Sequence, residues 1–213
     1  MIGMNDKLVW IDCEMTGLDL ATDALVEVAV LVTDGELNVL GDGIDVVIAT
    51  DPSALDAMGE VVRDMHTQSG LVEEIRASAV SMREAEQAIL GYVRTYVPEA
   101  GTAPLAGNTV GTDRGFLARD MPELVGHLHY RNVDVSTIKE LARRWYPKAF
   151  YAAPEKHGGH RALADIIESI DELRYYRLTV FVPAPGPSGT EAKAAAATLG
   201  IPAPDAAGET TRP

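Results

Sequence analysis

The sequence predicts an α/β fold, a mixed β-sheet with helices on its faces. Three consecutive segments rich in Val, Ile and Leu open the chain, and Gly, Asp and Asn residues separate them, which is typical of short strands joined by turns. Short connections make such strands antiparallel neighbours. After Pro52 the apolar residues recur at helical spacing, and short apolar segments then alternate with helices. The three strands are expected at residues 7–13, 24–33 and 37–49.

Capping signals and apolar segments indicate the later elements. Ser69 is the expected N-cap of a helix over 71–79. Ser81 and Glu84 have the spacing of a capping box, and the helix that they open ends before Pro98. The order βββαβαβα predicts a ribonuclease H-like mixed sheet flanked by helices. The remaining elements are expected as a strand at 104–107, a helix from about 113, a strand at 130–135, and helices at 136–145 and about 161–180.

The composition of the chain changes at Pro183. Residues 1–182 suffice for one domain with a sizeable core. Residues 183–213 hold six Pro, four Gly and nine Ala and no aromatic residue, too little apolar surface to offset the entropy of ordering. A helix over 191–199 is conceivable because Ala favours helices, but an isolated helix of that length is marginal. The sequence therefore predicts a domain at 1–182 and a disordered tail at 183–213.

The charge of the chain limits its partners. Its 18 Lys and Arg stand against 32 Asp and Glu, a formal net charge of -14. This balance argues against a basic surface that binds long duplex nucleic acid or an anionic membrane, but not against an enzyme that contacts nucleic acid through metal ions. The single cysteine, Cys13, excludes a disulfide scaffold and a Cys-rich zinc module. Neither a membrane span nor a signal peptide is indicated, so a cytoplasmic protein is expected.

The first expected strand ends in two carboxylates, Asp12 and Glu14. Residues two apart in a strand point to the same face of the sheet, where two like charges repel each other. A divalent cation is the usual compensation, and oxygen ligands suit Mg²⁺ or Mn²⁺. The alternative is a strand that ends at Ile11, with both carboxylates solvated in a turn.

Further groups could converge on the same point. Asp113 follows a polar loop between a strand and a helix, and Asp165 precedes the apolar stripe of a long helix. His160 follows two glycines, and its imidazole could take a proton from water, with His157 as the competing candidate. A helix N-cap, a surface aspartate and an ordinary exposed histidine are the corresponding structural alternatives. Together the four carboxylates and the histidine would assemble a two-metal site.

These residues lie within longer stretches that resemble the oligoribonuclease family, part of the DEDDh group of 3′→5′ exonucleases with a ribonuclease H-like fold. An Asp-x-Glu pair alone is weak, but the further motifs make a chance match very improbable. The resemblance covers nearly all of residues 7–180 and leaves the tail outside. The stretches are LVWIDCEMTGLD at 8–19, MHTQSGLVEEI at 65–75, GNTVGTDRGFLARDMPEL at 107–124, HYRNVDVSTIKELARRW at 129–145 and HRALADIIESIDEL at 160–173.

The resemblance implies roles for individual residues. Two divalent cations, Mg²⁺ or Mn²⁺, would bind at four carboxylates, and His160 would act as general base. Leu18 would wedge against a base, and His66 would lie near the substrate. The metal ligands would be Asp12, Glu14, Asp113 and Asp165, and the residues around the 5′-terminal phosphate and the nucleotides would be Thr109, Tyr130, Arg131 and Ser136.

Each substrate contact also has a structural alternative. Leu18 could close a turn, Tyr130 could pack inside the sheet, and Ser136 could be only an N-cap. One departure from the family is the absence of a tryptophan that can stack on a base, because Val61 or Val62 stands there.

The expected activity is hydrolysis of very short RNA, dinucleotides included, from the 3′ end to 5′-mononucleotides, which completes RNA degradation. The resemblance also implies a homodimer in which one chain completes the pocket of the other. The nearest alternative is a DNA-proofreading exonuclease of the same group. A catalytically silent nucleotide-binding module is disfavoured, because all four carboxylates and the histidine are present.

Overall fold

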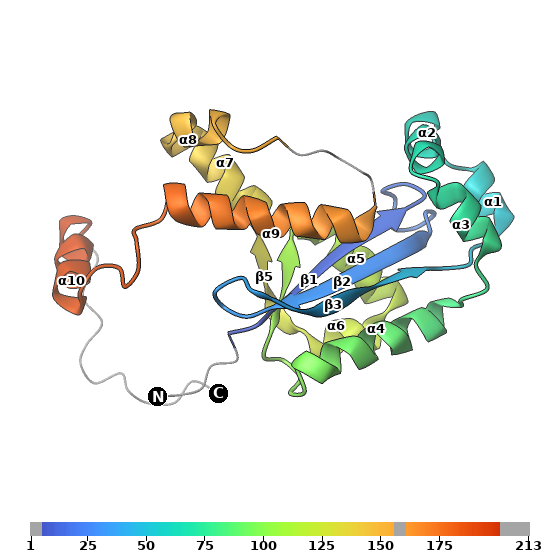
Figure 1. Cartoon of the computed structure of the whole chain (residues 1–213), viewed down its shortest axis with the longest axis horizontal. Helices are drawn as coiled ribbons and strands as arrows, with labels where there is room; N and C mark the ends of the chain where they lie inside the picture. Colours follow the sequence, from blue (N-terminus) through green and yellow to red (C-terminus); the bar gives the residue numbers. More distant parts are fainter. Residues whose placement is uncertain (1–5, 156–160, 201–213) are drawn as a thin grey trace.

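The centre of the molecule is a five-stranded mixed sheet, seen in a computed structural model that describes residues 6–155 and 161–200. The spatial order is β3-β2-β1-β4-β5 (Figure 1). The first three strands are antiparallel neighbours, whereas β4 pairs in parallel with both β1 and β5. The predicted mixed sheet is therefore confirmed. The strands are β1 (Leu8–Met15), β2 (Leu25–Thr33), β3 (Val39–Val47), β4 (Pro104–Gly107) and β5 (His129–Asp134).

Helices cover both faces of this sheet (Figure 1). The long helix α9 (Ala162–Thr179) and α7 (Val135–Trp145) lie on one face, where Trp10 of β1 is fully buried among them. The opposite face carries α4 (Met82–Tyr96), α5 (Val110–Asp120) and α6 (Pro122–His127). Ile11 and Cys13 of β1 point to this second face, as the alternation of side chains in a strand requires.

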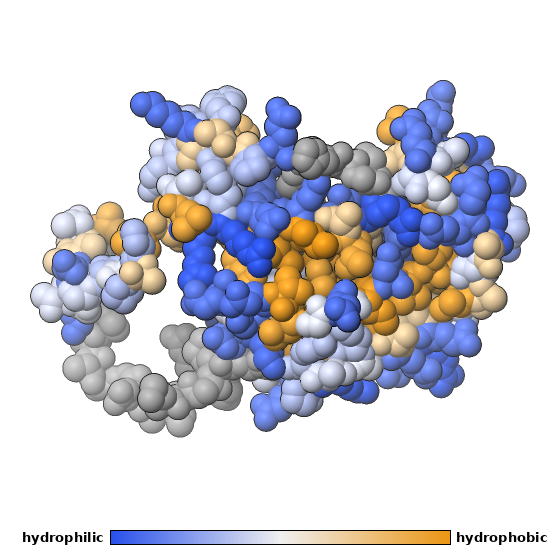
Figure 2. All heavy atoms as spheres, viewed as in Figure 1, coloured by the Kyte–Doolittle hydropathy of each residue, from blue (hydrophilic) through white to orange (hydrophobic). Residues whose placement is uncertain are grey.

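The strand β3 forms one edge of the sheet and carries several apolar side chains. On the side of the molecule drawn in Figure 1, apolar side chains gather over β2 and β3 below α9, and hydrophilic side chains surround them (Figure 2). Leu40, Ile44 and Val46 of β3 are half-buried and pack against the core beneath α4. The edge strand β3 therefore packs one of its faces against the core.

A unit of three helices follows β3 at one end of the sheet: α1 (Pro52–Asp56), α2 (Glu60–Gln68) and α3 (Leu71–Ala77). The prediction that Ser69 caps α3 is wrong. Because α2 extends to Gln68, Ser69 is its C-cap, and the Ser69 hydroxyl donates to the carbonyl of His66. Gly70 then begins α3 at a φ of 80°, a left-handed conformation that glycine adopts without steric cost.

Two further helices begin earlier than predicted. The helix α5 starts at Val110 rather than near Asp113, so that Asp113 lies within its first turn. The helix α7 starts at Val135, and its N-cap Asp134 accepts a hydrogen bond from the backbone N–H of Ser136. The short helices α6 and α8 (Pro147–Tyr151) were not predicted; each opens with proline, which suits the first helical position.

The helix considered at 191–199 is present as α10 (Gly189–Thr198), with a capping box between Ser188 and Glu191. None of its residues is buried. The domain boundary at 182/183 stays a prediction, and residues 201–213 lie outside the described part. Within residues 6–155 and 161–200, no helix combines the length and the apolar character needed to cross a membrane.

Candidate active site

Three carboxylates converge on the sheet face that α9 covers. The strand β1 continues to Met15, so the alternative that it ends at Ile11 is wrong. Asp12 and Glu14 therefore point to the same face as Trp10, and Asp165 approaches from the first turn of α9. One oxygen from each of these carboxylates lies within 4.8 Å of the others.

The fourth predicted carboxylate, Asp113, adjoins this group from α5. Its Oδ1 accepts a hydrogen bond from the backbone N–H of Cys13 at 3.1 Å, and its side chain is nearly buried. The contact fixes Asp113 against the strand residue between Asp12 and Glu14. The alternative of a solvated N-cap is therefore wrong for Asp113, because Thr109 is the N-cap of α5 and Asp113 is buried.

Burial and mutual repulsion raise the pKa values of the carboxyl groups in this cluster. Burial and then the charge of Asp113 raise the pKa of Asp12 to about 8, and burial followed by the charge of Glu27 raises the pKa of Glu14 to about 8. Burial also raises the pKa of Asp113 to about 6. Crowded carboxylate oxygens of this kind are the donor set that a hard divalent cation compensates. The residues present therefore fit divalent metal binding.

His66 supports the cluster from α2. It is fully buried, its Nε2 lies 2.9 Å from the carbonyl oxygen of Met15, and its Nδ1 lies 3.8 Å from Oε2 of Glu14. The imidazole thus touches the end of β1 and one carboxylate at once. His66 is therefore a buried neighbour of the Glu14 carboxylate.

An ion-pair cluster that the sequence did not reveal fixes the start of α9. Arg161 lies 3.0 Å from the fully buried Glu27 of β2 and donates two hydrogen bonds, at 2.7 and 2.9 Å, to Glu74 of α3. Glu27 also accepts from the N–H of Ala162 at 3.4 Å. The carbonyl of Arg161 accepts from the N–H of Asp165 at 3.1 Å, so the cluster anchors the turn that presents Asp165.

A second polar group lies where β4 and β5 end. The helix after β4, α5, packs on one sheet face, and the helix after β5, α7, packs on the other. Such a reversal between adjacent parallel strands leaves a crevice at their carboxyl ends, the usual ligand site of open α/β sheets. Thr109 and Ser136 flank it, with their hydroxyl oxygens 3.1 Å apart.

Other predicted substrate contacts are exposed. Leu18 has 75% of its surface exposed, so the alternative of a turn-closing core residue is wrong. Tyr130 is also exposed rather than packed inside; its ring stacks on His129, and the Arg131 guanidinium lies 5.4 Å from its centroid. Val61, in place of the family tryptophan, is 81% exposed, whereas Val62 packs against the core of the α1–α3 unit.

The predicted general base, His160, and its competitor His157 lie outside the described residues. Sequence reasoning missed Glu27, although a glutamate inside an otherwise apolar strand is itself a signal of a buried ion pair. It also missed Asn108 and Asp134, which surround the hydroxyl pair and carry no motif of their own.

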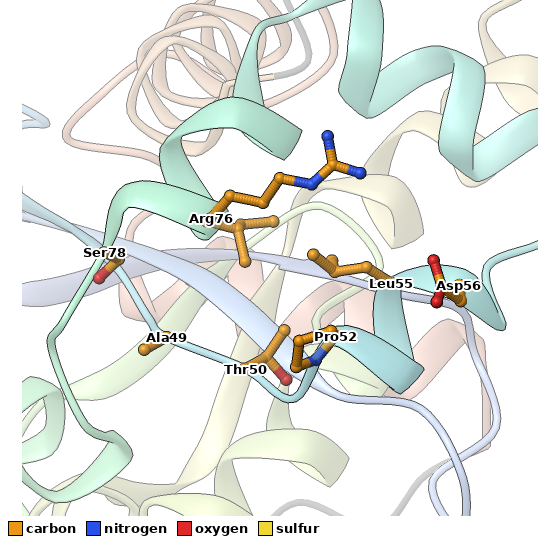
Figure 3. A pocket seen from close by; sticks show the side chains of 8 residues that line it. Ala49, Thr50, Pro52, Leu55, Asp56, Arg76 and Ser78 are labelled. Atoms are coloured by element: carbon orange, nitrogen blue, oxygen red, sulfur yellow. The ribbon is translucent and has the colours of Figure 1, made fainter.

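The structure also contains a small surface cavity of about 330 Å³ away from the carboxylates. It lies between the end of β3, α1 and α3, where Arg76 reaches over Leu55 and Pro52 (Figure 3). None of the predicted site residues lines it. This cavity therefore has no part in the site.

The fold and the carboxylate cluster together define an exonuclease. The family model described as Exonuclease (RNase_T) matches residues 9–173. Among solved structures, a product-bound exonuclease I aligns with a TM-score of 0.62 at 16% identity, over 82% of this chain and 44% of that chain. The exonuclease I of Methylocaldum szegediense gives 0.57 at 19% identity, over 82% and 41%. The chain thus spans less than half of those structures, and the likeness shows the ribonuclease H-like exonuclease fold.

Curated relatives make the assignment more specific. An oligoribonuclease of Streptomyces griseus is 64% identical over 200 residues, 94% of this chain and 99% of that protein. An oligoribonuclease of Rhodococcus jostii is 63% identical over 197 residues, 92% of this chain and 99% of that protein. The chain belongs to the oligoribonuclease family, a family of 3′→5′ exoribonucleases, and the predicted family and activity are confirmed.

Proposed function

We propose that this chain hydrolyses very short RNA, dinucleotides included, from the 3′ end and releases 5′-mononucleotides. The observation that carries the proposal is the convergence of Asp12, Glu14 and Asp165 on one point of the sheet face. Hydrogen bonds connect Ser136, which lies beside Thr109, to the helix of Asp165, and this connection supports a single substrate region that includes both groups. In the cell the activity would complete RNA degradation in the cytoplasm.

The cofactors would be two divalent cations, Mg²⁺ or Mn²⁺, held by Asp12, Glu14, Asp113 and Asp165. When bound, they supply Lewis acidity, which lowers the pKa of water and offsets negative charge on the phosphodiester. The raised pKa values of Asp12 and Glu14 support this assignment, since a divalent cation is the usual compensation for crowded, desolvated carboxylates.

The reaction itself is an in-line hydrolysis. His160 takes a proton from water while the water oxygen forms a bond to phosphorus, and the bond from phosphorus to the 3′ oxygen breaks. The departing oxygen leaves as a 3′-hydroxyl once it gains a proton. The assignment of His160 rests on the family motif, His followed five residues later by Asp165.

The remaining side chains would bind the substrate. Leu18 is exposed beside β1 and would wedge against a base, and Tyr130 would contact the nucleotides with its exposed ring. Arg131 suits the 5′-terminal phosphate because a guanidinium binds phosphate through two hydrogen bonds. Thr109 and Ser136 would lie against the same phosphate, and the Thr109 hydroxyl would donate a hydrogen bond to it while Ser136 donates to Asn108. His66, which is buried, would act near the substrate through Glu14.

A homodimer is part of the proposal. The exposed apolar residues Trp145 and Tyr151 of α7 and α8 support it, since a second copy could cover them. The rival of a DNA-proofreading exonuclease is not favoured, because the curated relatives are oligoribonucleases. The assembled carboxylates likewise disfavour a catalytically silent binding module.

Initial rates on three substrates test the proposal: a 5′-phosphorylated RNA dinucleotide, a seven-nucleotide RNA and a single-stranded DNA, each with Mn²⁺ and with chelator. The dinucleotide should be hydrolysed fastest, and chelator should stop all hydrolysis. Equal rates on all three, or activity that survives chelation, would refute it. His160→Ala should lower turnover far more than affinity, with His157→Ala as the matched control.

A further inference from the structure

Thr109 has a backbone conformation that its side chain disfavours. Its φ of 55° and ψ of 33° are left-handed, which costs roughly 1–2 kcal/mol for a residue other than glycine and is rarer still for a β-branched one. As the N-cap of α5 it would normally accept a hydrogen bond from its own helix, but it makes no such bond. Its hydroxyl lies beside that of Ser136 instead.

Asp134 holds this strained backbone in place. Its Oδ1 accepts from the backbone N–H of Thr109 at 3.1 Å and from that of Ser136 at 2.9 Å. One carboxylate oxygen thereby connects the N-cap residue of α5 with the first turn of α7. The hydroxyls of Thr109 and Ser136 are consequently held next to each other, with their oxygens 3.1 Å apart.

A chain of hydrogen bonds continues from the hydroxyl pair to the helix of Asp165. The Ser136 hydroxyl donates to Oδ1 of Asn108 at 2.9 Å, and Nδ2 of Asn108 donates to the Ser169 hydroxyl at 2.8 Å. The Ser169 hydroxyl in turn donates to the backbone carbonyl of Asp165 at 2.8 Å. Three side chains, from two helices and the loop after β4, thus connect the hydroxyl pair with the backbone of a predicted metal ligand.

A second contact reinforces this chain. Nδ2 of Asn108 also donates to Oε2 of Glu172 at 3.2 Å, and Nζ of Lys139 lies 3.1 Å from Oε1 of the same carboxylate. Glu172 is nearly buried, so these contacts compensate a desolvated charge. The contact between Lys139 and Glu172 therefore joins α7 to α9 next to Asn108.

We propose that Asn108 and Ser169 are positioning residues that set the distance between the 5′-phosphate pocket and the carboxylate cluster, and so determine the preference for a 5′-phosphorylated dinucleotide. This inference rests on the proposed function. Neither residue needs to touch the substrate, because each acts by orienting a group that does. Recognition of the phosphate end and alignment of the scissile bond then depend on one connected set of contacts.

The experiment compares three variants of the full chain. Ser169→Ala removes the link to Asp165, and Asn108→Asp keeps the acceptor for Ser136 but replaces the donor with an anion that faces Glu172. Thr179→Ala is the matched control, because Thr179 donates to the carbonyl of Tyr175 on the same helix and lies outside the chain of contacts. The measured quantity is the ratio of kcat/KM for the 5′-phosphorylated over the 5′-hydroxyl dinucleotide.

Ser169→Ala should lower this ratio about threefold to tenfold, the range of one net hydrogen bond, and Asn108→Asp should lower it further. Thr179→Ala should leave it within about twofold. In chelator, where hydrolysis stops, the binding constants of the two dinucleotides should show the same loss of preference. Equal losses on both substrates, with the ratio unchanged, would overturn the inference alone. A wild-type ratio near one would overturn the phosphate pocket of the proposed function as well.

Discussion

Arg161→Met should destabilise the protein in a pH-dependent manner. Methionine keeps much of the apolar length of the side chain but leaves Glu27 buried without its cation. Removal of one partner from a buried ion pair costs about 3–5 kcal/mol, and because the Arg161 side chain is 30% exposed we expect the lower end, about 3 kcal/mol at pH 8. For a domain of this size that corresponds to a decrease in Tm of about 6–12 °C.

The pH dependence follows from the pKa of Glu27, which burial and then the charge of Asp45 raise from 4.5 to about 7 while Arg161 lowers it. A raised folded-state pKa contributes stability below the unfolded value and loses it as the pH rises through about 7. Without Arg161 the pKa rises further, so the difference between variant and wild type should grow from pH 5.5 to pH 8. The charged groups that act on Glu27 or share its cation are Asp12 and Glu14 of β1, Asp45 of β3, Glu74 of α3 and Arg161, the N-cap of α9.

Thermal unfolding in chelator at both pH values measures this difference. Arg177→Met is the matched control, since Arg177 lies on the same helix and pairs with an exposed glutamate, Glu36, at the surface. That variant should lose at most about 1 kcal/mol at either pH. The reasoning would be refuted if Arg161→Met lost no more than Arg177→Met, or lost the same amount at pH 5.5 as at pH 8.

Three further predictions concern the substrate region. Asp12→Asn should raise the Tm of the chelated protein at pH 8 by relieving repulsion, abolish hydrolysis and reduce the Tm increase that Mn²⁺ causes; a variant that keeps the full Mn²⁺ shift would contradict this. Leu18→Ala should raise KM without lowering Tm, because Leu18 is largely exposed and is predicted to contact a base. Leu178→Ala is the matched control: Leu178 is also largely exposed but lies outside the predicted site, so this variant should leave both KM and Tm unchanged. Val61→Trp should lower KM, since a base stacked on an aromatic ring contributes about 1–3 kcal/mol, and an unchanged KM would show that Val61 lies outside base-stacking reach.

The parts of the site that follow local periodicity could be predicted from the sequence. The two-residue spacing of Asp12 and Glu14 placed them on one sheet face, and the apolar stripe of the last long helix placed Asp165 over it. The contact between Arg161 and Glu27 could not be predicted, because it joins residues 134 positions apart through the packing of α9 on the sheet. The conformation of Thr109 was also beyond prediction, since local propensity opposes it and contacts with the distant residues Asp134 and Ser136 stabilise it.

The short substrate is consistent with how the chain uses its cations. Proteins that bind long nucleic acid rely on many Lys and Arg contacts with phosphates. Here many arginines are already paired with carboxylates of the same chain: Arg119, Arg143, Arg144, Arg161, Arg174 and Arg177. Arg131 is the arginine among the predicted substrate contacts; it lies over Tyr130 and forms no ion pair with any residue that the structure describes.

The net negative charge of the chain would also disfavour long substrates. Two divalent ions at the carboxylates would change the net charge of -14 to about -10, so the loaded enzyme would still repel a polyanion. The scissile phosphate of a dinucleotide would contact the ions. Its 5′-terminal phosphate would contact Arg131, Thr109 and Ser136. Each further nucleotide would add a phosphate to this repulsion. The net negative charge of the chain therefore favours a short substrate, in addition to the contacts at its 5′ end.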